Sequence, residues 1–195
     1  MLGGGPSLKS VDVDRLRGSR VIAVNNAYKL GDWIDVLFYG DCHWLQPNKH
    51  AMQNWPGLKV TVCEGHAGKL DIKVLSRRRA MQGLSTQPGT LTWNLSSGAC
   101  AINLAFLFGV KRIVLLGFDM RKVDGEPNWH HDYGPRSPNH DPYKRFLRPF
   151  PAIAEALKRH HVEVVNATPE SALTVFPIVD PETVLPSVKE TVWME

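Results

Sequence analysis

The sequence is poor in cysteine and contains no long apolar run. It has three cysteines and no CxxC pair, so we predict neither a disulfide framework nor a zinc ribbon. Cys100 lies within the longest apolar run, residues 99–110, and is expected to be a core residue. This run is interrupted by Asn103 and is shorter than the ~20 residues of a transmembrane helix. The first residues also lack the character of a secretory signal, so we expect a cytoplasmic protein without a membrane span.

Composition and charge indicate one globular domain. The chain has 195 residues, of which 43% are hydrophobic and 22% are charged, as in average globular proteins. These values exclude a disordered chain, a collagen-like fibre and a coiled coil. The 23 lysines and arginines exceed the 19 acidic residues and give a net charge of +4. This mild excess suits a phosphate-bearing partner, but it does not by itself indicate nucleic-acid binding.

Short apolar runs alternate with helix-like segments along the chain, which predicts an α/β fold with a mostly parallel sheet flanked by helices. The expected strands are a first one cut short at residues 1–2, followed by residues 20–25, 36–39, 58–63, 72–75, 112–116 and 162–166. The expected helices are residues 11–16, 43–55, 96–108 and 144–161, and the expected loops are residues 77–90 and 121–143. We assign residues 1–178 to one nucleotide-binding domain and residues 179–195 to a loosely attached C-terminal tail. The oligomeric state is left open.

Polar residues follow several of these strands, where ligands bind in open α/β sheets. Glycines after the first strand allow backbone amides to approach a phosphate, and the start of the helix at 96–108 favours an anion. We therefore predict a nucleotide-sized site at this edge. Its candidate residues are Gly3, Gly4, Gly5, Pro6, Ser7, Asn25, Asn26, Asp41, Ser96, Ser97, Gly98 and Asp119.

Each of these residues also has a purely structural interpretation. The glycine turn matches neither GxGxxG nor a P-loop and could be a tight surface turn. Ser97 could be only a helix N-cap, and Asn25 could merely adopt a left-handed turn conformation. Asp119 could cap a helix or form a turn. The combination is more specific than its parts.

A second candidate region is the polar loop at 121–143, which contains His130, His131 and His140. Histidine suits proton transfer near neutral pH, so we interpret these residues as candidate bases. The alternative is a metal site that includes Asp119, His131 and Asp132, although the spacing matches no zinc signature. The three arginines at 77–79 could contact the phosphates of an acceptor, but a solvated charged surface is the favoured interpretation.

Four motifs then resemble a known family. They are Gly3-Gly4-Gly5-Pro6-Ser7-Leu8, residues 21–25 (VIAVN), Ser96-Ser97-Gly98, and residues 109–119 (GVKRIVLLGFD). In this order they resemble the bacterial family 42 sialyltransferases, which transfer sialic acid from CMP-sialic acid. They are also similar to a wider group that includes the archaeal 6-hydroxymethylpterin pyrophosphokinase and many phage and prophage proteins. The resemblance covers residues 2–176.

The resemblance implies a Rossmann-like, GT-A-like fold, a nucleotide held at the Gly-Pro-Ser turn and a histidine base. By position, Asn25 and Ser97 match donor-contacting residues of the family. His140 is the nearest match to the base, with His130 and His131 as rivals. The chain departs from the family at Gly4, where the family has asparagine, and at Arg121, where it has tyrosine. An arginine could stabilise the same leaving-group charge.

We therefore predict a transferase, specifically a sialyltransferase-like glycosyltransferase of phage or bacterial type, with a nucleotide-sugar donor of CMP type and no required cofactor. The glycine turn and Ser97 would hold the leaving phosphate, while Asn25 and Asp41 would bind the nucleoside. The acceptor is left open between a glycan and a modified nucleic acid. One alternative is an ATP- and Mg²⁺-dependent pyrophosphokinase in which Asp41, Asp119 and Asp132 approach the metal. The other is a non-catalytic nucleotide-binding module.

Overall fold

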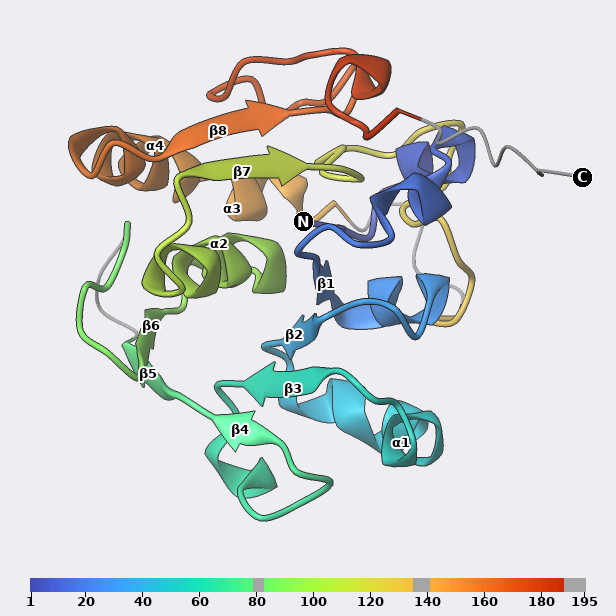
Figure 1. Cartoon of the computed structure of the whole chain (residues 1–195), viewed down its shortest axis with the longest axis vertical. Coiled ribbons are helices and arrows are strands. Elements are labelled where there is room, and N and C mark those ends of the chain that lie inside the picture. Colours follow the sequence, from blue (N-terminus) through green and yellow to red (C-terminus); the bar gives the residue numbers. More distant parts are fainter. Residues whose placement is uncertain (79–82, 135–140, 188–195) are drawn as a thin grey trace, which may run out of the picture.

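Parallel strands form the centre of the fold (Figure 1). The computed structural model describes residues 1–78, 83–134 and 141–187. One group of parallel strands contains, in spatial order, β1 (Ile22–Val24), β2 (Val36–Tyr39), β3 (Leu58–Thr61) and β4 (Lys73–Val74). A second parallel pair contains β7 (Arg112–Leu115) and β8 (Glu163–Asn166). Leu2 lies between the two groups, because it forms parallel bridges to Ala23 and to Leu116. The predicted α/β class with parallel pairing is confirmed.

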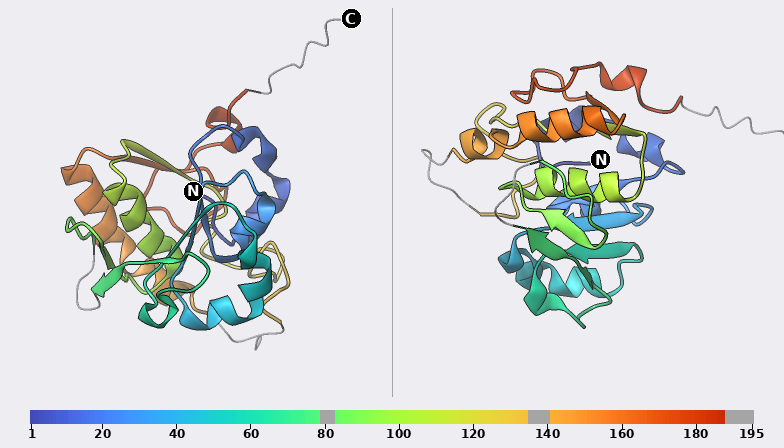
Figure 2. Two further views of the ribbon diagram at one scale, coloured as in Figure 1. Left: turned by 60° about the horizontal axis from the view of Figure 1, so that its bottom comes forward. Right: turned by 90° about the vertical axis from the view of Figure 1, so that its left-hand side faces the viewer.

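Helices cover both faces of these strands, because alternate side chains point to opposite sides. Ile22, Val24 and Phe38 belong to a core shared with α2 (Ser97–Leu107) and α4 (Phe150–Arg159). Ala23 and Leu37 belong to a second core shared with α1 (Leu45–Gln53). Figure 2 shows α2 and α4 side by side, away from α1. The strand ends therefore belong to a well-packed scaffold.

The helix α2 fixes one wall of the candidate site. Residues 99–105 are all buried, as the apolar sequence predicts. Ser96 caps the helix, because its Oγ accepts a hydrogen bond of 3.2 Å from Ala99 N. The buried Asn103 Oδ1 accepts hydrogen bonds from Ser85 N (2.8 Å) and Thr92 N (2.9 Å). These contacts tie α2 to the preceding segment.

Two predicted segments differ from the structure. The expected loop at 77–90 is wrong at both ends, where β5 (Ser76–Arg78) and β6 (Thr90–Thr92) pair in parallel. The contacts of Asn103 help to order this polar segment, and they are not visible in its composition. The expected helix at 144–161 is divided into α3 (Tyr143–Leu147) and α4. Pro149 and Pro151 lie at this break and lack the N–H that a continuous helix needs.

Several connections contain short 3-10 helices rather than longer elements. They are η1 (Pro6–Ser10), η2 (Val13–Leu16), η3 (Asn25–Leu30), η4 (Cys42–Trp44), η5 (Glu64–His66) and η6 (Pro181–Thr183). Two of them, η3 and η4, begin at the carboxyl ends of β1 and β2. They place polar residues at the sheet edge where the site is predicted.

The prediction that the cysteines form no disulfide is wrong. Cys42 and Cys63 form a disulfide with a Cα–Cα distance of 5.4 Å. Both residues follow neighbouring parallel strands, β2 and β3, so the sheet brings them together although 21 positions separate them. Cys100 is a free, buried thiol in the core, as expected. Burial raises its pKa above the ordinary range.

The described part of the C-terminal segment is attached to the domain. Arg15 Nη1 contacts Glu182 Oε2 at 2.6 Å, and Leu185 is buried. Residues 179–187 therefore contact the domain, while residues 188–195 of the expected tail lie outside the described residues. Within the described ranges, no helix combines the length and apolar character that crossing a membrane requires.

Candidate functional site

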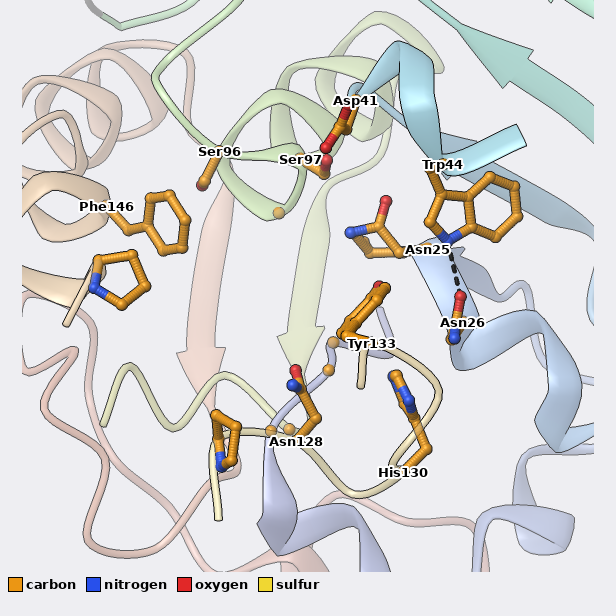
Figure 3. A pocket seen from close by; sticks show the side chains of 18 of the residues that line it. Asn25, Asn26, Asp41, Trp44, Ser96, Ser97, Asn128, His130, Tyr133 and Phe146 are labelled. Carbon is orange, nitrogen blue, oxygen red and sulfur yellow. Dashed lines mark hydrogen bonds between the residues drawn. The ribbon is translucent and has the colours of Figure 1, made fainter. Parts of the chain in front are cut away.

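The predicted site residues meet in a cleft at the carboxyl ends of the strands (Figure 3). The cleft has a volume of about 1550 Å³. Of the predicted donor-binding residues, all except Pro6 and Ser7 line it. The loop residues Arg121, His130, His131 and Asp132 line it as well. The structure therefore gathers residues that are far apart in the sequence.

The glycine turn offers fewer amides to a ligand than its sequence suggests. Gly3 N donates to Leu116 O and Gly5 N donates to Gly117 O, each at 2.8 Å. These two amides bind the neighbouring backbone. Gly4 N has no hydrogen-bond partner among the described residues. Of the three glycine amides of this turn, only that of Gly4 is therefore available to a ligand among the described contacts.

Asp119 holds this turn in place. Its Oδ1 accepts a hydrogen bond from Ser7 N (3.1 Å), and its Oδ2 accepts one from Ser7 Oγ (2.8 Å). Pro6 has no N–H to donate. Asp119 is 2% exposed. Burial raises the pKa of its carboxyl, while the hydrogen bonds from Ser7 and the charge of Arg121 oppose this rise. Ser7 and Asp119 therefore support the site from below its surface.

We expect Asp119→Asn to gain stability relative to the original chain as pH rises. An asparagine can keep both contacts, since its oxygen accepts from Ser7 N and its amide donates to Ser7 Oγ. Because the folded pKa of Asp119 is raised, the folded state binds more protons than the unfolded state between the two pKa values. This contribution to the free energy of unfolding falls as pH rises through that window. Urea unfolding of both proteins from pH 4 to pH 8 measures the difference, and a gain for the original chain with rising pH would contradict it.

Asn25 and Asn26 have different surroundings. Asn26 is buried, and its Oδ1 accepts a hydrogen bond of 2.6 Å from Trp44 Nε1. Its Nδ2 donates to Asp132 Oδ2 at 2.8 Å, so both ends of this amide are occupied. Asn25 points into the cleft (Figure 3), and its buried Oδ1 has no hydrogen-bond partner among the described residues. Asn25 is therefore the amide that remains available to a ligand.

The residues at the start of α2 also divide into two roles. Ser96, rather than Ser97, is the N-cap. Ser97 Oγ accepts a hydrogen bond of 3.2 Å from Gly40 N and retains a hydroxyl hydrogen that can donate. Asp41 lies near Ser97 at the cleft (Figure 3) and accepts a hydrogen bond from His43 N, which caps η4. Ser97 thus joins α2 to the end of β2 and faces the cleft.

The loop after β7 is anchored through Asp132 and the glycine turn. Asp132 Oδ2 accepts hydrogen bonds of 2.8 Å from Lys29 Nζ and from Asn26 Nδ2. The contact with Lys29 is the main cause of a lowered pKa for Asp132. Trp129 N donates to Gly4 O at 3.1 Å. The described part of the loop therefore forms a wall of the cleft.

The two described histidines of this loop differ in burial. The side chain of His130 is 6% exposed, and its Nδ1 lies 3.4 Å from Asp132 Oδ2. Its ring packs against Tyr133, with 4.8 Å between the centroids. The side chain of His131 is 77% exposed, and its Nδ1 lies 3.6 Å from Glu126 Oε2. His130 is therefore the better oriented of the two.

The remaining predicted catalytic residues are His140 and Arg121. His140 lies outside the described residues. Arg121 lines the cleft and pairs through Nη2 with Glu170 Oε2. Its buried Nε has no hydrogen-bond partner in the described ranges. One N–H group of this guanidinium thus remains available near the cleft.

Three residues of the cleft have left-handed backbone conformations. Asn25, Leu95 and Met120 all line the cleft and have positive φ angles of 52°, 62° and 51°. Such angles are uncommon outside glycine and are unusual for leucine and methionine. Residues held in these conformations cluster at binding and catalytic sites. The conformation of Asn25 is the left-handed one that its sequence allowed, whereas those of Leu95 and Met120 were not predicted. Residues outside the cleft, such as Leu70 and Asp71, also have positive φ angles.

The structure also adds residues that the sequence argument did not include. Trp93, Phe146 and Tyr133 line the cleft, as does Arg77, which was expected to be part of a solvated surface. The favoured interpretation of Arg77 as a solvated residue did not foresee that its guanidinium lies 5.5 Å from the ring centroid of Trp93. A pairing of this kind depends on the strand register, which the run of arginines did not reveal.

The alternative metal site gains no support from these contacts. The carboxylate of Asp119 is occupied by Ser7, and that of Asp132 by Lys29 and Asn26. Within the described residues, no group of three or more His, Cys, Asp or Glu side chains could together hold a metal ion. The predicted donor set Asp119, His131 and Asp132 is therefore not brought together.

Comparisons with known proteins agree with this architecture. No protein-family model and no curated protein sequence matches the chain. A solved structure that does match is the sialyltransferase CstII from Campylobacter jejuni in complex with the substrate analogue CMP-3FNeuAc. The TM-score is 0.56 at 17% identity, and the match covers 96% of this chain and 88% of that chain. At this identity the likeness shows a sialyltransferase-like fold.

Proposed function

We propose that this chain is a glycosyltransferase that transfers a sugar from a nucleotide-activated donor of CMP type to an acceptor hydroxyl. The observation that carries the proposal is the available Asn25 amide in a strained cleft at the strand ends. A buried polar atom without a partner is costly, and a ligand that donates a hydrogen bond would satisfy it. The likeness to a structure solved with a CMP-sugar analogue supports the choice of donor.

The donor would contact three groups of the chain. Gly4 N and Ser97 Oγ would donate hydrogen bonds to the phosphate, which would also be favoured by the N-terminal end of α2. Asn25, with Asp41 nearby, would bind the nucleoside. The supporting residues in this arrangement are Gly3, Gly5, Pro6, Ser7, Asn26, Ser96, Gly98 and Asp119. Apart from Pro6 and Gly98, they shape the cleft through the contacts described above.

The proposed reaction is a direct displacement. The acceptor oxygen forms a bond to the anomeric carbon of the donor sugar while the bond from that carbon to the phosphate oxygen breaks. A histidine takes the proton of the acceptor hydroxyl, and the nucleoside monophosphate leaves with the electron pair of the broken bond. His140, His130 and His131 are the candidate bases. Arg121, oriented by Glu170, would offset the charge of the departing phosphate.

Titration of the chain with CMP, UDP, GDP and ATP, with and without Mg²⁺, tests the donor class. We expect CMP to bind in the absence of Mg²⁺ and CMP-sialic acid to be consumed. Binding of ATP alone, with a requirement for Mg²⁺, would instead favour the pyrophosphokinase alternative. Binding of CMP without turnover of any CMP-sugar would favour a non-catalytic module.

The adjacent serines offer a matched pair of variants for the same titration. We expect Ser96→Ala to lower the free energy of unfolding by ~1 kcal/mol, because it removes the helix cap, and to leave CMP affinity unchanged. Ser97→Ala should cost a similar stability through the lost contact with Gly40. It should also weaken CMP binding by ~10-fold or more, since a hydrogen bond to a charged group contributes ~1.5–3 kcal/mol.

A companion variant examines Asn25 without adding backbone strain. Glycine accepts a positive φ, so Asn25→Gly removes the amide and keeps the turn. Isothermal titration with CMP and urea unfolding should be run on all three variants. Equal CMP affinity in Ser96→Ala, Ser97→Ala and Asn25→Gly would reject the proposed donor site.

A further inference from the structure

Two arginines at the cleft each lie over an aromatic ring. The guanidinium of Arg77 lies 5.5 Å from the ring centroid of Trp93, and that of Arg145 lies 5.2 Å from the ring centroid of Phe146. All four residues line the cleft. The two pairs come from separate elements, since Arg77 is in β5 and both Arg145 and Phe146 are in α3. The proposed donor contacts use none of them.

Arg77 and Arg145 differ from Lys29 and Arg121, two other cations of the cleft, because they have no acidic partner among the described residues. Lys29 pairs with Asp132, and Arg121 pairs with Glu170. Within the described residues, neither Arg77 nor Arg145 forms an ion pair. No described carboxylate therefore neutralises their positive charges. An arginine that stacks on a ring keeps N–H groups at its edge for a planar oxyanion.

The Arg77–Trp93 pair lies next to the start of α2. A Cβ atom on Gly40 would overlap Trp93 Cζ3 and lie 3.3 Å from Ser97 Oγ, so the tryptophan edge reaches the backbone beside Ser97. Phe146 and Ser96 both line the cleft and appear on the same side of the view in Figure 3. In the same view, Trp44 and Asn26 bound the other end of the cleft, beyond Asn25. The Arg77–Trp93 pair thus lies beside Ser97, next to the position proposed for the donor phosphate.

The size of the cleft leaves room for a second ligand. Sites for one small molecule usually enclose ~300–1,000 Å³. The volume of about 1550 Å³ exceeds this range. A transferase must hold donor and acceptor together, and the four residues of the arginine pairs take no part in the proposed donor contacts.

We propose that Arg77–Trp93 and Arg145–Phe146 form an acceptor subsite for a sugar that carries an oxyanion, either a carboxylate or a phosphate monoester. This inference rests on the proposed function, because it identifies the acceptor of that reaction. The arginines bind the oxyanion, and the aromatic rings provide apolar surface for the sugar ring. An acceptor of this kind complements the charge of these arginines.

An array of glycans in matched forms tests the subsite on the full chain. Each glycan is displayed in a neutral form, with a terminal uronic or sialic acid, and with a terminal phosphate monoester. We expect the acidic forms to be retained at least ~10-fold more strongly than the neutral form, since charged hydrogen bonds to arginine are lost in the latter. The stronger of the two acidic forms identifies the source of the oxyanion.

Three arginine variants make the test specific. Arg77→Met and Arg145→Met should each remove most of the preference for acidic glycans and leave CMP affinity unchanged. Arg17→Met is the matched control, because Arg17 lies over Trp33 at the same 5.5 Å but does not line the cleft. It should keep the preference. Urea unfolding of each variant checks that all three proteins are folded.

The outcomes separate the subsite from the donor site. Equal retention of acidic and neutral glycans, or no retention of either, would overturn the subsite even if CMP binds. An acidic preference that survives both variants would also overturn it, as would a loss of CMP affinity without a change in that preference. Retention of acidic glycans by a chain that binds no nucleotide would support the oxyanion subsite and reject the transferase proposal.

Discussion

Gly5→Val is expected to lower the free energy of unfolding by ~3 kcal/mol or more. A Cβ atom at position 5 would overlap Asp119 Oδ2 and would lie 2.8 Å from Gly117 O. The backbone carbonyl cannot easily move, because it already accepts a hydrogen bond from Gly5 N. Overpacking costs ~1–3 kcal/mol, and displacing Asp119 from Ser7 adds a similar penalty for a buried polar group. Urea unfolding measures the loss.

Gly4→Ala is the matched control. The nearest atom to a Cβ at position 4 is Asn128 Oδ1 at 3.4 Å, so we expect a loss of stability below ~1 kcal/mol. A double-mutant cycle with Asp119→Ala identifies the cause of the larger effect. Gly5→Ala should cost much less in the Asp119→Ala background, because the overlapping carboxylate is gone. A cost that is the same in both backgrounds would contradict this explanation.

Loss of the general base should have the largest effect on turnover. A positioned base contributes ~10²–10⁴-fold, so one of His140→Ala, His130→Ala and His131→Ala should lose at least ~100-fold in kcat with CMP affinity unchanged. His130 is held by Asp132, whose backbone N donates a hydrogen bond of 3.3 Å to Nδ1 and whose carboxylate lies 3.4 Å from the same atom. His140 is the nearest match to the base of the family that the sequence resembles. The kcat of His140→Ala should therefore be compared directly with that of His130→Ala.

His43→Ala serves as the control for this series. His43 also lines the cleft but comes from η4, outside the histidine loop. It should keep near-normal turnover of a CMP-sugar. Full turnover in all three loop variants would place the base elsewhere. If the loop variants lose activity and added Mg²⁺ or Mn²⁺ restores part of it, the loop takes part in a metal site instead.

The sequence allowed the strands and the cleft edge to be predicted because both depend on local pattern. Val36–Tyr39 is a strand with the bounds that its apolar run indicates. The polar residues after the strands converge because parallel strands end at one edge. Asn25, Asp41, Ser97 and Asp119 therefore line one cleft as expected.

The sequence could not show which polar atoms are already engaged. Asp119 is bound to Ser7 across 112 positions, and Asn26 is held by Trp44 and Asp132. Such contacts depend on the folded register and have no local signature. The same limit explains the missed disulfide. It also explains why Arg77 was assigned to a solvated surface.

The disulfide has a practical consequence for labelling experiments. Cys42 lines the cleft and is exposed, whereas Cys63 is buried. A reducing buffer that opens the bond leaves an accessible thiol at the mouth of the cleft, while the other free cysteine, Cys100, stays in the core. A maleimide fluorophore would then attach at Cys42, close enough to report when a nucleotide enters. Preparations made with and without reductant are chemically different at this edge. Their ligand affinities should therefore be measured and compared separately.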